Sequence, residues 1–593
     1  MKREKINAKY KWTIDEMYPT ESDFRVDVEK VKKLIKNLSN QKESIAESKE
    51  NLYQTLHTEE MTSQILEKLT VYTHMKCHED TRINENQEIA SEIDNLYTEF
   101  EIADSYVDSE ILNMDSKLLD LYLQDEKLSH WKFYIEKIMR DKPYKLTQKE
   151  EELLSATSDF SKAGKDTFEM LAYADMKFPK IKDELGESIQ LSEANYGRFL
   201  RSKDRNIREN AFKSLFDTYE NYKNTFASTL YNNIKSEIFH SKMRHFKNIL
   251  EFELYDENIT TDVYENLISS VNKNIPILDK YIELKKEYLG LDEMHMYDLY
   301  TPLANFDMNI SYENAQVIIL EALKPMGEEY LSHIKDAFKN GWIDVYANDG
   351  KKSGAYSWGC YDSNPYILMN YQNDLNSVFT LIHELGHSMH SFYSKNTQSY
   401  LYSNYEIFVA EVASTVNEQL LIQYLLKNAK SKEEKIYLLN YYLEQFRTTV
   451  YRQTMFAEFE KITHEMVEKG KGLTAENFKK IYMDLNKKYY GKTCVIDEEI
   501  GMEWARIPHF YSNFYVYKYA TGFSAASALS KQIIEEGEIA VERYKTFLKS
   551  GGSDYPLNQL KNTGVNMEKK ESIEQALSVF TNLVDELGKE INK

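Results

Sequence analysis

The run from His383 to His387 reads His-Glu-Leu-Gly-His and brings together the residue types that bind and activate a metal. Residues four apart on a helix lie within about 40° of each other, so both imidazoles can bind one ion. Zinc accepts imidazole nitrogens at about 2.0–2.1 Å. The carboxylate of Glu384 can then reach the water held on the metal. The H-E-x-x-H spacing therefore predicts a zinc site in which Glu384 is the general base.

The competing interpretation is a histidine pair on an ordinary amphipathic helix. With 13 histidines in 593 residues, chance produces this pattern only roughly 0.03 times. The surrounding residues also predict a buried helix, in which three polar groups need a reason to be present. These apolar residues are Val378, Phe379, Leu381, Ile382, Leu385 and Met389.

A catalytic zinc ion also needs a third protein ligand and an open position for water. His390 lies one turn beyond His387 and is either a further ligand, a supporting residue or simply packed. A second predicted helix, from Glu406 to about Leu426, offers Glu406 and Glu411. We favour Glu411, because the small residues Ala410 and Ala413 flank it and would let two helices approach closely. The alternative for either glutamate is a solvated helix face.

The elements that must position these side chains are mostly helices. The chain has only 20 Gly and 9 Pro, less than half the usual share of about 12%. Sandwiches, propellers and barrels need more turn residues than this, so the fold class is mainly α. The predicted zinc helix runs from Leu375 to about Tyr393, with Asp374 as its N-cap.

One region before that helix is typical of β structure. Three short strands are predicted at Trp342–Tyr346, Ala355–Trp358 and Tyr366–Tyr371, joined by tight turns as a small meander. In zinc peptidases a substrate commonly adds as an extra strand to a nearby sheet edge. Gly354, Ala355 and Tyr356 are therefore candidate substrate-binding residues, and a purely structural meander is the alternative.

Charge and cysteine content exclude several classes of function. The formal net charge of −22 disfavours nucleic acid and anionic membrane surfaces as partners. No apolar run is long enough to span a bilayer, and the N-terminus lacks the apolar segment of a secretory signal. The three cysteines, Cys77, Cys360 and Cys494, are far apart, which predicts no disulfide framework and a cytoplasmic location.

Several longer motifs resemble the M3 metallopeptidases, and within them the oligoendopeptidase F type. The similarity is carried by five runs: residues 352–357 (KSGAYS), 383–390 (HELGHSMH), 408–415 (FVAEVAST), 506–511 (RIPHFY) and 514–522 (FYVYKYATG). The resemblance implies a helical, bowl-like or clam-like zincin with an enclosed substrate channel, and Glu411 as the third zinc ligand. It also divides the chain into an N-terminal helical region (1–110), the family's N-terminal helical domain (111–190) and a catalytic domain (191–593).

The resemblance also gives a role to a cluster of hydrogen-bond donors near the C-terminus. His509, Tyr511, Tyr515, Tyr517 and Tyr519 lie within eleven residues, and such groups can donate to the oxyanion of peptide hydrolysis. In the resembled family a histidine and tyrosines of this region do so. We expect His509, Tyr515 and Tyr517 to act there and Tyr511 to contact substrate. On a single helix Tyr511, Tyr515 and Tyr519 would share one face, with Tyr517 nearer His509. Packing is the alternative in a chain with 45 Tyr.

The sequence thus predicts a zinc endopeptidase that acts on short unstructured peptides, with one Zn²⁺ per chain held by His383, His387 and Glu411. Two alternatives stay open: an exopeptidase on a similar helical zinc scaffold, and a protein that binds peptides without cleaving them. The intact Glu384 argues against a pure binder. A second histidine pair, His74 and His78, lacks the intervening glutamate and is not predicted to bind metal. The sequence leaves open whether the protein is a monomer or a homo-oligomer.

Overall fold

The chain folds almost entirely as helices. The computed structural model describes residues 2–304, 306 and 308–593, with 71% of the chain in helix and 3% in strand. The mainly α prediction is therefore confirmed, as expected for a chain with so few helix-breaking residues. None of the described helices combines the length and the apolarity that a bilayer-spanning segment needs.

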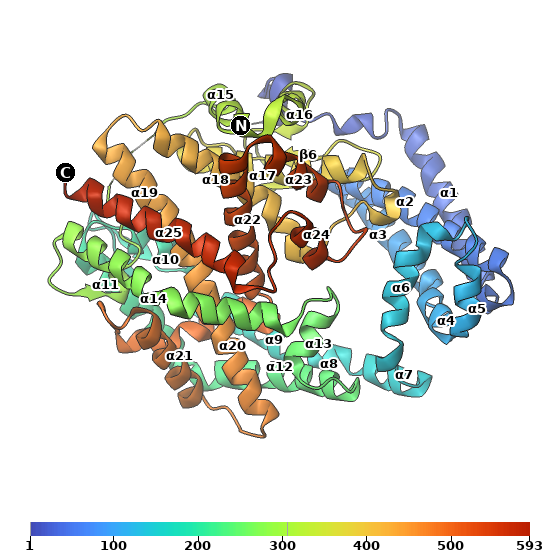
Figure 1. The fold of residues 1–593 in the computed structure, drawn as a ribbon, viewed down its shortest axis with the longest axis horizontal. Helices are drawn as coiled ribbons and strands as arrows, with labels where there is room; N and C mark the ends of the chain where they lie inside the picture. Colours follow the sequence, from blue (N-terminus) through green and yellow to red (C-terminus); the bar gives the residue numbers. More distant parts are fainter. Residues whose placement is uncertain (1, 305, 307) are drawn as a thin grey trace. The chain divides into compact units, whose positions relative to one another are not determined.

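The chain divides into two compact units, each assembled from three stretches of sequence. Unit 1 comprises Met1–Lys145, Asp307–Tyr424 and Leu529–Gly564. Its helices (Figure 1) are α1 Glu21–Asn40, α2 Lys49–Glu79, α3 Asn84–Asp104, α4 Val107–Asn113, α5 Ser116–Tyr122, α6 Lys132–Arg140, α15 Tyr312–Ala322, α16 Gly327–Lys339, α17 Leu375–Lys395, α18 Ile407–Lys427, α23 Glu538–Leu548 and α24 Pro556–Asn562.

Unit 2 comprises Leu146–Phe306, Leu425–Ala528 and Val565–Lys593. The domain boundaries predicted near residues 110 and 190 come from the resemblance to a family and not from compactness. They stay predictions. The helices of unit 2 are α7 Gln148–Ala156, α8 Ser158–Ser161, α9 Ala163–Glu169, α10 Glu193–Leu200, α11 Arg205–Asn221, α12 Lys223–Met243, α13 Ile249–Tyr255, α14 Thr261–Leu289, α19 Lys432–Phe446, α20 Arg452–Glu468, α21 Ala475–Tyr490 and α25 Lys570–Ile591, with the part of α22 Tyr517–Glu536 that precedes Leu529.

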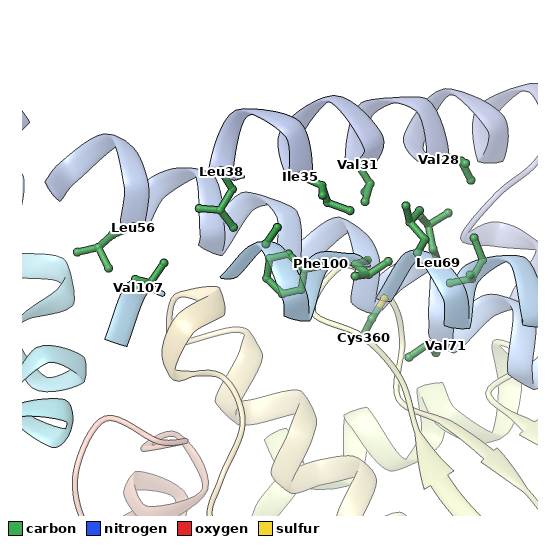
Figure 2. Packing of buried hydrophobic residues seen from close by; sticks show 14 of the residues in the cluster. Val28, Val31, Ile35, Leu38, Leu56, Leu69, Val71, Phe100, Val107 and Cys360 are labelled. Carbon is green, nitrogen blue, oxygen red and sulfur yellow. The ribbon is translucent and has the colours of Figure 1, made fainter. Parts of the chain in front are cut away.

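The N-terminal helices of unit 1 share one hydrophobic core with its sheet. Val28, Val31, Ile35 and Leu38 recur at helical spacing along α1, and Figure 2 shows them on the side of α1 that faces the other labelled core residues. Cys360, two residues after strand β5, belongs to the same buried cluster. The N-terminal helices therefore support the β region directly.

The three predicted strands form, but their order is not that of a meander. They are β4 Ile343–Asp344, β5 Tyr356–Trp358 and β6 Tyr366–Leu368, in the order β4-β6-β5. β6 lies in the middle, parallel to β4 and antiparallel to β5. The prediction of a meander was wrong, because a long connection lets the chain cross from β4 past the central strand. As a result β5 is an edge strand.

Four further short strands lie in unit 2 and were not predicted. β1 Lys180–Lys182 and β2 Ser188–Gln190 pair antiparallel around a turn at Gly186, whose φ of 78° suits glycine. β3 Met294–His295 pairs parallel with β7 Cys494–Val495. Strands of two or three residues carry too little alternation of apolar and polar residues to stand out in a sequence.

The predicted zinc helix is present as α17. The Asp374 side chain accepts a hydrogen bond from the Ser377 N–H at 2.7 Å, so the predicted N-cap is confirmed. The helix ends at Lys395, two residues beyond the prediction. All six of its residues that were predicted to be buried are at most 3% exposed: Val378, Phe379, Leu381, Ile382, Leu385 and Met389.

Candidate metal centre and active site

Three side chains of unit 1 converge on one point. His383 and His387 project from α17 and Glu411 from α18. The two Nε2 atoms are 3.2 Å apart, and Glu411 Oε2 lies 3.4 Å from His383 Nε2 and 3.5 Å from His387 Nε2. Ligands around a tetrahedral zinc ion, at bond lengths of about 2.0–2.1 Å, are about 3.3–3.4 Å apart. The triangle therefore fits one zinc ion at its centre.

The site is open on one side, as a catalytic rather than a structural zinc site requires. The Glu411 side chain is 47% exposed, whereas those of His383 and His387 are 27% and 18% exposed. Burial would raise the pKa of Glu411, but the hydrogen bond and charge of His387, the charge of His383 and a hydrogen bond from Ser414 hold it at about 2. Glu411 is therefore a carboxylate, the form that binds metal.

Helices α17 and α18 approach closely because a glycine lies at their contact. A Cβ atom on Gly386 would lie 2.5 Å from the Ser414 Cα and 2.7 Å from the Ala413 carbonyl oxygen. The prediction that small residues allow this approach used the alanines beside Glu411. In the structure, the residue of α17 that packs against Ala413 is Gly386, which lies inside the H-E-x-x-H run itself.

Glu418 is a functional candidate that sequence reasoning missed. His383 Nδ1 lies 2.5 Å from Glu418 Oε1, so Nδ1 carries the proton and Nε2 is left free to bind metal. Burial would lower the pKa of His383, but the Glu418 hydrogen bond and the charges of Glu418, Glu384 and Glu411 outweigh it and raise the pKa to about 9. Metal binding at Nε2 would therefore displace a proton from that nitrogen. The signal that could have found Glu418 is its spacing, because it follows Glu411 by two helical turns on the same face.

Glu384 lies against the edge strand β5. It is 7% exposed, and burial raises its pKa, while the charges of His383 and His387 and a hydrogen bond from the backbone N–H of Ser357 act to lower it. The Ser357 hydroxyl also lies 2.8 Å from that of Ser388 on α17. Since Ser357 N–H points to Glu384 and not to β6, the C=O of the same residue also points outward. The predicted base therefore lies beside the outer edge of β5, where the Ser357 N–H is bonded to it and the Ser357 C=O faces outward.

The residues predicted to bind substrate lead into this strand. Gly354 is exposed, has a φ of 84°, and has open space where a side chain would be. Its carbonyl accepts a hydrogen bond from the Asn370 side chain at 2.8 Å. Ala355 and Tyr356 are half-buried. The structure thus places all three beside Ser357, on the segment next to Glu384.

Two alternative metal ligands are engaged elsewhere. His390 is 1% exposed, its ring stacks on Tyr405 at 3.6 Å, and burial lowers its pKa to about 3. Glu406 lies just before α18 and pairs with Lys137 at 2.7 Å. Neither belongs to the three-residue group, so His390 is a packed histidine and Glu406 forms a surface ion pair.

The predicted oxyanion donors all belong to unit 2. The rings of His509, Tyr515 and Tyr519 lie within 5.4–6.3 Å of one another, and Tyr519 Oη is 3.4 Å from His509 Nε2. Tyr517 is fully buried, with its ring 5.2 Å from that of Tyr264. The tyrosine beside His509 is therefore Tyr519 and not Tyr517.

The prediction named Tyr517 because it assumed that this whole segment forms a single helix. α22 begins only at Tyr517, and the preceding Phe514 has a φ of 50°, a left-handed conformation that interrupts any helix. Tyr511, before the interruption, is buried, and its hydroxyl lies 2.6 Å from that of Thr229. Helical spacing therefore does not relate Tyr511 to Tyr515 and Tyr519.

Comparison with known proteins identifies the family. The model of peptidase family M3 matches residues 198–579, and that of oligopeptidase F matches residues 110–178. The chain belongs to peptidase family M3. The predicted resemblance is thus confirmed, and this M3 peptidase is a metalloendopeptidase, as predicted.

Full-length relatives support the same assignment. The M3 peptidase is 45% identical to oligopeptidase PepF of Bacillus subtilis over 99% of this chain and 88% of the relative. It is 39% identical to group B oligopeptidase PepB of Streptococcus agalactiae, covering 99% and 98% of the two chains. The crystal structure of oligoendopeptidase-F from Enterococcus faecium superposes with a TM-score of 0.74 at 36% identity, covering 96% and 99% of the chains.

Proposed function

We propose that this M3 peptidase is a zinc-dependent oligoendopeptidase that hydrolyses internal bonds of short, unstructured peptides. The observation that carries the proposal is the triangle of His383, His387 and Glu411, with Glu384 one residue from the first ligand. The donor set of two imidazoles and one carboxylate suits zinc. When bound, a zinc ion would polarise the scissile carbonyl and make an attacking water more acidic.

The chain's own residues supply the proton transfers and the alignment. Glu384 accepts a proton from the attacking water and passes it to the leaving amine. An extended peptide donates a backbone N–H to the outward C=O of Ser357, so that its scissile bond lies along the edge of β5 next to Glu384. Glu418 keeps His383 in the tautomer that presents Nε2. Gly354, Ala355 and Tyr356 form the segment on which the peptide is aligned.

The family resemblance supports a further part of the proposal, the oxyanion donors near the C-terminus. His509 and Tyr515 would donate to the oxyanion that forms at the attacked carbon. Tyr517 was predicted to share this role, and its complete burial favours Tyr519 in its place. Replacing either Tyr515 or Tyr519 with Phe should lower kcat about 10²–10³-fold with little change in KM. The same change at Tyr517 is the matched comparison, because it removes one hydroxyl from the same segment.

The proposed substrates are peptides rather than folded proteins. The relatives' names, oligopeptidase and oligoendopeptidase, support this class. An enclosed channel, which the family resemblance implies, would admit flexible chains only. We also propose that the enzyme acts in the cytoplasm, where intact proteins would need such protection.

The decisive experiment uses an internally quenched peptide blocked at both ends. The zinc-loaded enzyme should cleave it, whereas an exopeptidase would not and a peptide-binding protein would leave all peptides intact. The chelator phenanthroline should abolish cleavage. Glu384→Gln should retain stoichiometric zinc, measured by elemental analysis, and lose at least about 10³-fold in kcat. Unchanged cleavage by this variant with zinc bound would refute the proposed mechanism.

A further inference from the structure

The turn between α2 and α3 holds the loop that leads into the edge strand β5. The Lys352 N–H donates to the His78 carbonyl at 3.0 Å, and the Thr81 N–H donates to the Gly350 carbonyl at 2.7 Å. The Thr81 hydroxyl donates to the same Gly350 carbonyl at 2.9 Å. A segment near residue 80 and a segment near residue 350 are therefore bonded backbone to backbone within unit 1.

The side chain of His78 extends this attachment into the strand itself. Its Nε2 lies 3.3 Å from Lys352 Nζ and its Nδ1 lies 2.7 Å from Tyr356 Oη. An ammonium group can only donate, so Nε2 is the acceptor and the proton is on Nδ1. His78 therefore donates a hydrogen bond to the Tyr356 hydroxyl and accepts one from Lys352. These two bonds fix the orientation of the His78 ring and the position of Tyr356, the first residue of β5.

Strand β5 has a different neighbour on each face. Successive side chains of a strand point to opposite faces. Ser357 contacts the zinc helix through Ser388, whereas Trp358 lies 6.3 Å from the rings of both His74 and His78 on α2. The strand is thus held between α17 and α2, with its outer edge beside Glu384.

We propose that His78 is a positioning residue for peptide hydrolysis: through Tyr356 it fixes the register and height of β5, against which the substrate backbone is aligned. The proposal rests on the proposed function, in which β5 is the substrate edge. It assigns a role in the reaction to helix α2, which lies some 300 residues from the zinc motif in the sequence.

The physical reason for needing this support is the brevity of the strand. β5 has three residues and pairs with only one neighbour, β6. So short a two-stranded pairing is weak by itself. A shift of about 1 Å in a substrate-aligning element can cost up to about 10²-fold in rate. Loss of the His78 bond, with the backbone bonds retained, should lower kcat/KM about tenfold, mainly through KM.

The experiment compares His78→Ala, Tyr356→Phe and the double variant in the full-length, zinc-loaded enzyme, using the blocked quenched peptide. Tyr356→Phe removes only the hydroxyl that accepts from His78. His78→Asn is the conservative variant, since its amide can donate from nearly the position of Nδ1. His74→Ala is the matched control, one turn earlier on α2, with its ring against Trp358 but its bond directed to Asp94.

The proposal expects each single variant to raise KM, the double variant to be no worse than the worse single, and His78→Asn to recover part of the loss. Zinc content and apparent Tm should match those of His74→Ala. Unchanged KM in both single variants would overturn the proposal, as would additive losses or a loss equally large in His74→Ala. If the unmodified enzyme does not cleave the blocked peptide, the proposed function fails, which is a separate outcome.

Discussion

Gly386→Ala tests whether the close contact between α17 and α18 creates the metal site. The added Cβ would lie 2.5–2.8 Å from the Ser414 Cα, the Ser414 nitrogen and the Ala413 carbonyl oxygen, where ordinary contacts begin at 3.4 Å. All three are backbone atoms, so no side chain can turn away. The helices must therefore separate by about 1 Å, or α17 must shift along its axis by a similar amount.

The size of the effect follows from the tolerance of the ligand triangle. Zinc–ligand distances are held within about 0.2 Å, so a displacement of about 1 Å removes Glu411 as a ligand or lengthens its bond. We expect zinc affinity to fall at least about 10-fold and up to about 10³-fold. Overpacking should cost about 1–3 kcal/mol, offset by about 1 kcal/mol from the better helix propensity of alanine.

The assay is competition for zinc between the protein and a chromophoric chelator, with kcat/KM measured at saturating zinc. Gly197→Ala is the matched control, since Gly197 lies within α10 and a Cβ there would meet nothing within 4 Å. That variant should bind zinc normally and be no less stable. A zinc affinity for Gly386→Ala within twofold of the unmodified enzyme would refute the argument that this glycine sets the helix separation.

Three further predictions follow from charged groups. Glu418→Gln keeps an acceptor for His383 but removes its charge, so zinc affinity should fall about 10-fold in the same competition assay; an unchanged affinity would contradict this. Asp298→Asn leaves the guanidinium of Arg208, 3% exposed and 2.7 Å away, without its counter-charge, and should cost about 3–5 kcal/mol in urea unfolding. A cost below about 1 kcal/mol would show that the pair is not needed. Burial and a neighbouring carboxylate raise the pKa of Asp104 to about 6, so its native proton stabilises the fold at low pH and that stabilisation is lost as pH rises towards 6. Asp104→Asn should therefore raise the apparent Tm more at pH 8 than at pH 5, because pH 5 lies inside the window between the unfolded and folded pKa of Asp104 and pH 8 lies above it; the reverse pattern would contradict the assigned burial.

Local features of the zinc helix were predictable because they depend on neighbours in the sequence. The N-cap Asp374, the apolar face of α17 and the four-residue spacing of His383 and His387 all follow from helical periodicity. The choice of Glu411 over Glu406 used only the small residues around it. The structure supports that choice through the contact of Gly386 with α18.

Features that depend on where distant segments meet were not predictable. The order β4-β6-β5 depends on which strand the chain crosses, and the alternation of a three-residue strand does not reveal it. The left-handed conformation of Phe514 interrupts the helix assumed for this segment and changes the direction of the chain after it. As a result Tyr519, and not Tyr517, lies beside His509. The contacts of His78 could not be predicted, because its partners, Lys352 and Tyr356, lie far along the chain.

The sequence alone was enough to predict the family and the chemistry proposed for this M3 peptidase, including the two histidine ligands at their spacing on one helix and the general base. These depend on residue identity and on a helical repeat that needs no knowledge of the rest of the chain. The tertiary structure was needed to show the contacts of Glu418 with His383, of Ser357 with Glu384, and of His78 on α2 with Tyr356 in β5. Such contacts form when the packing of the core brings remote segments to within hydrogen-bond distance. No local pattern of residues predicts which segments will come together.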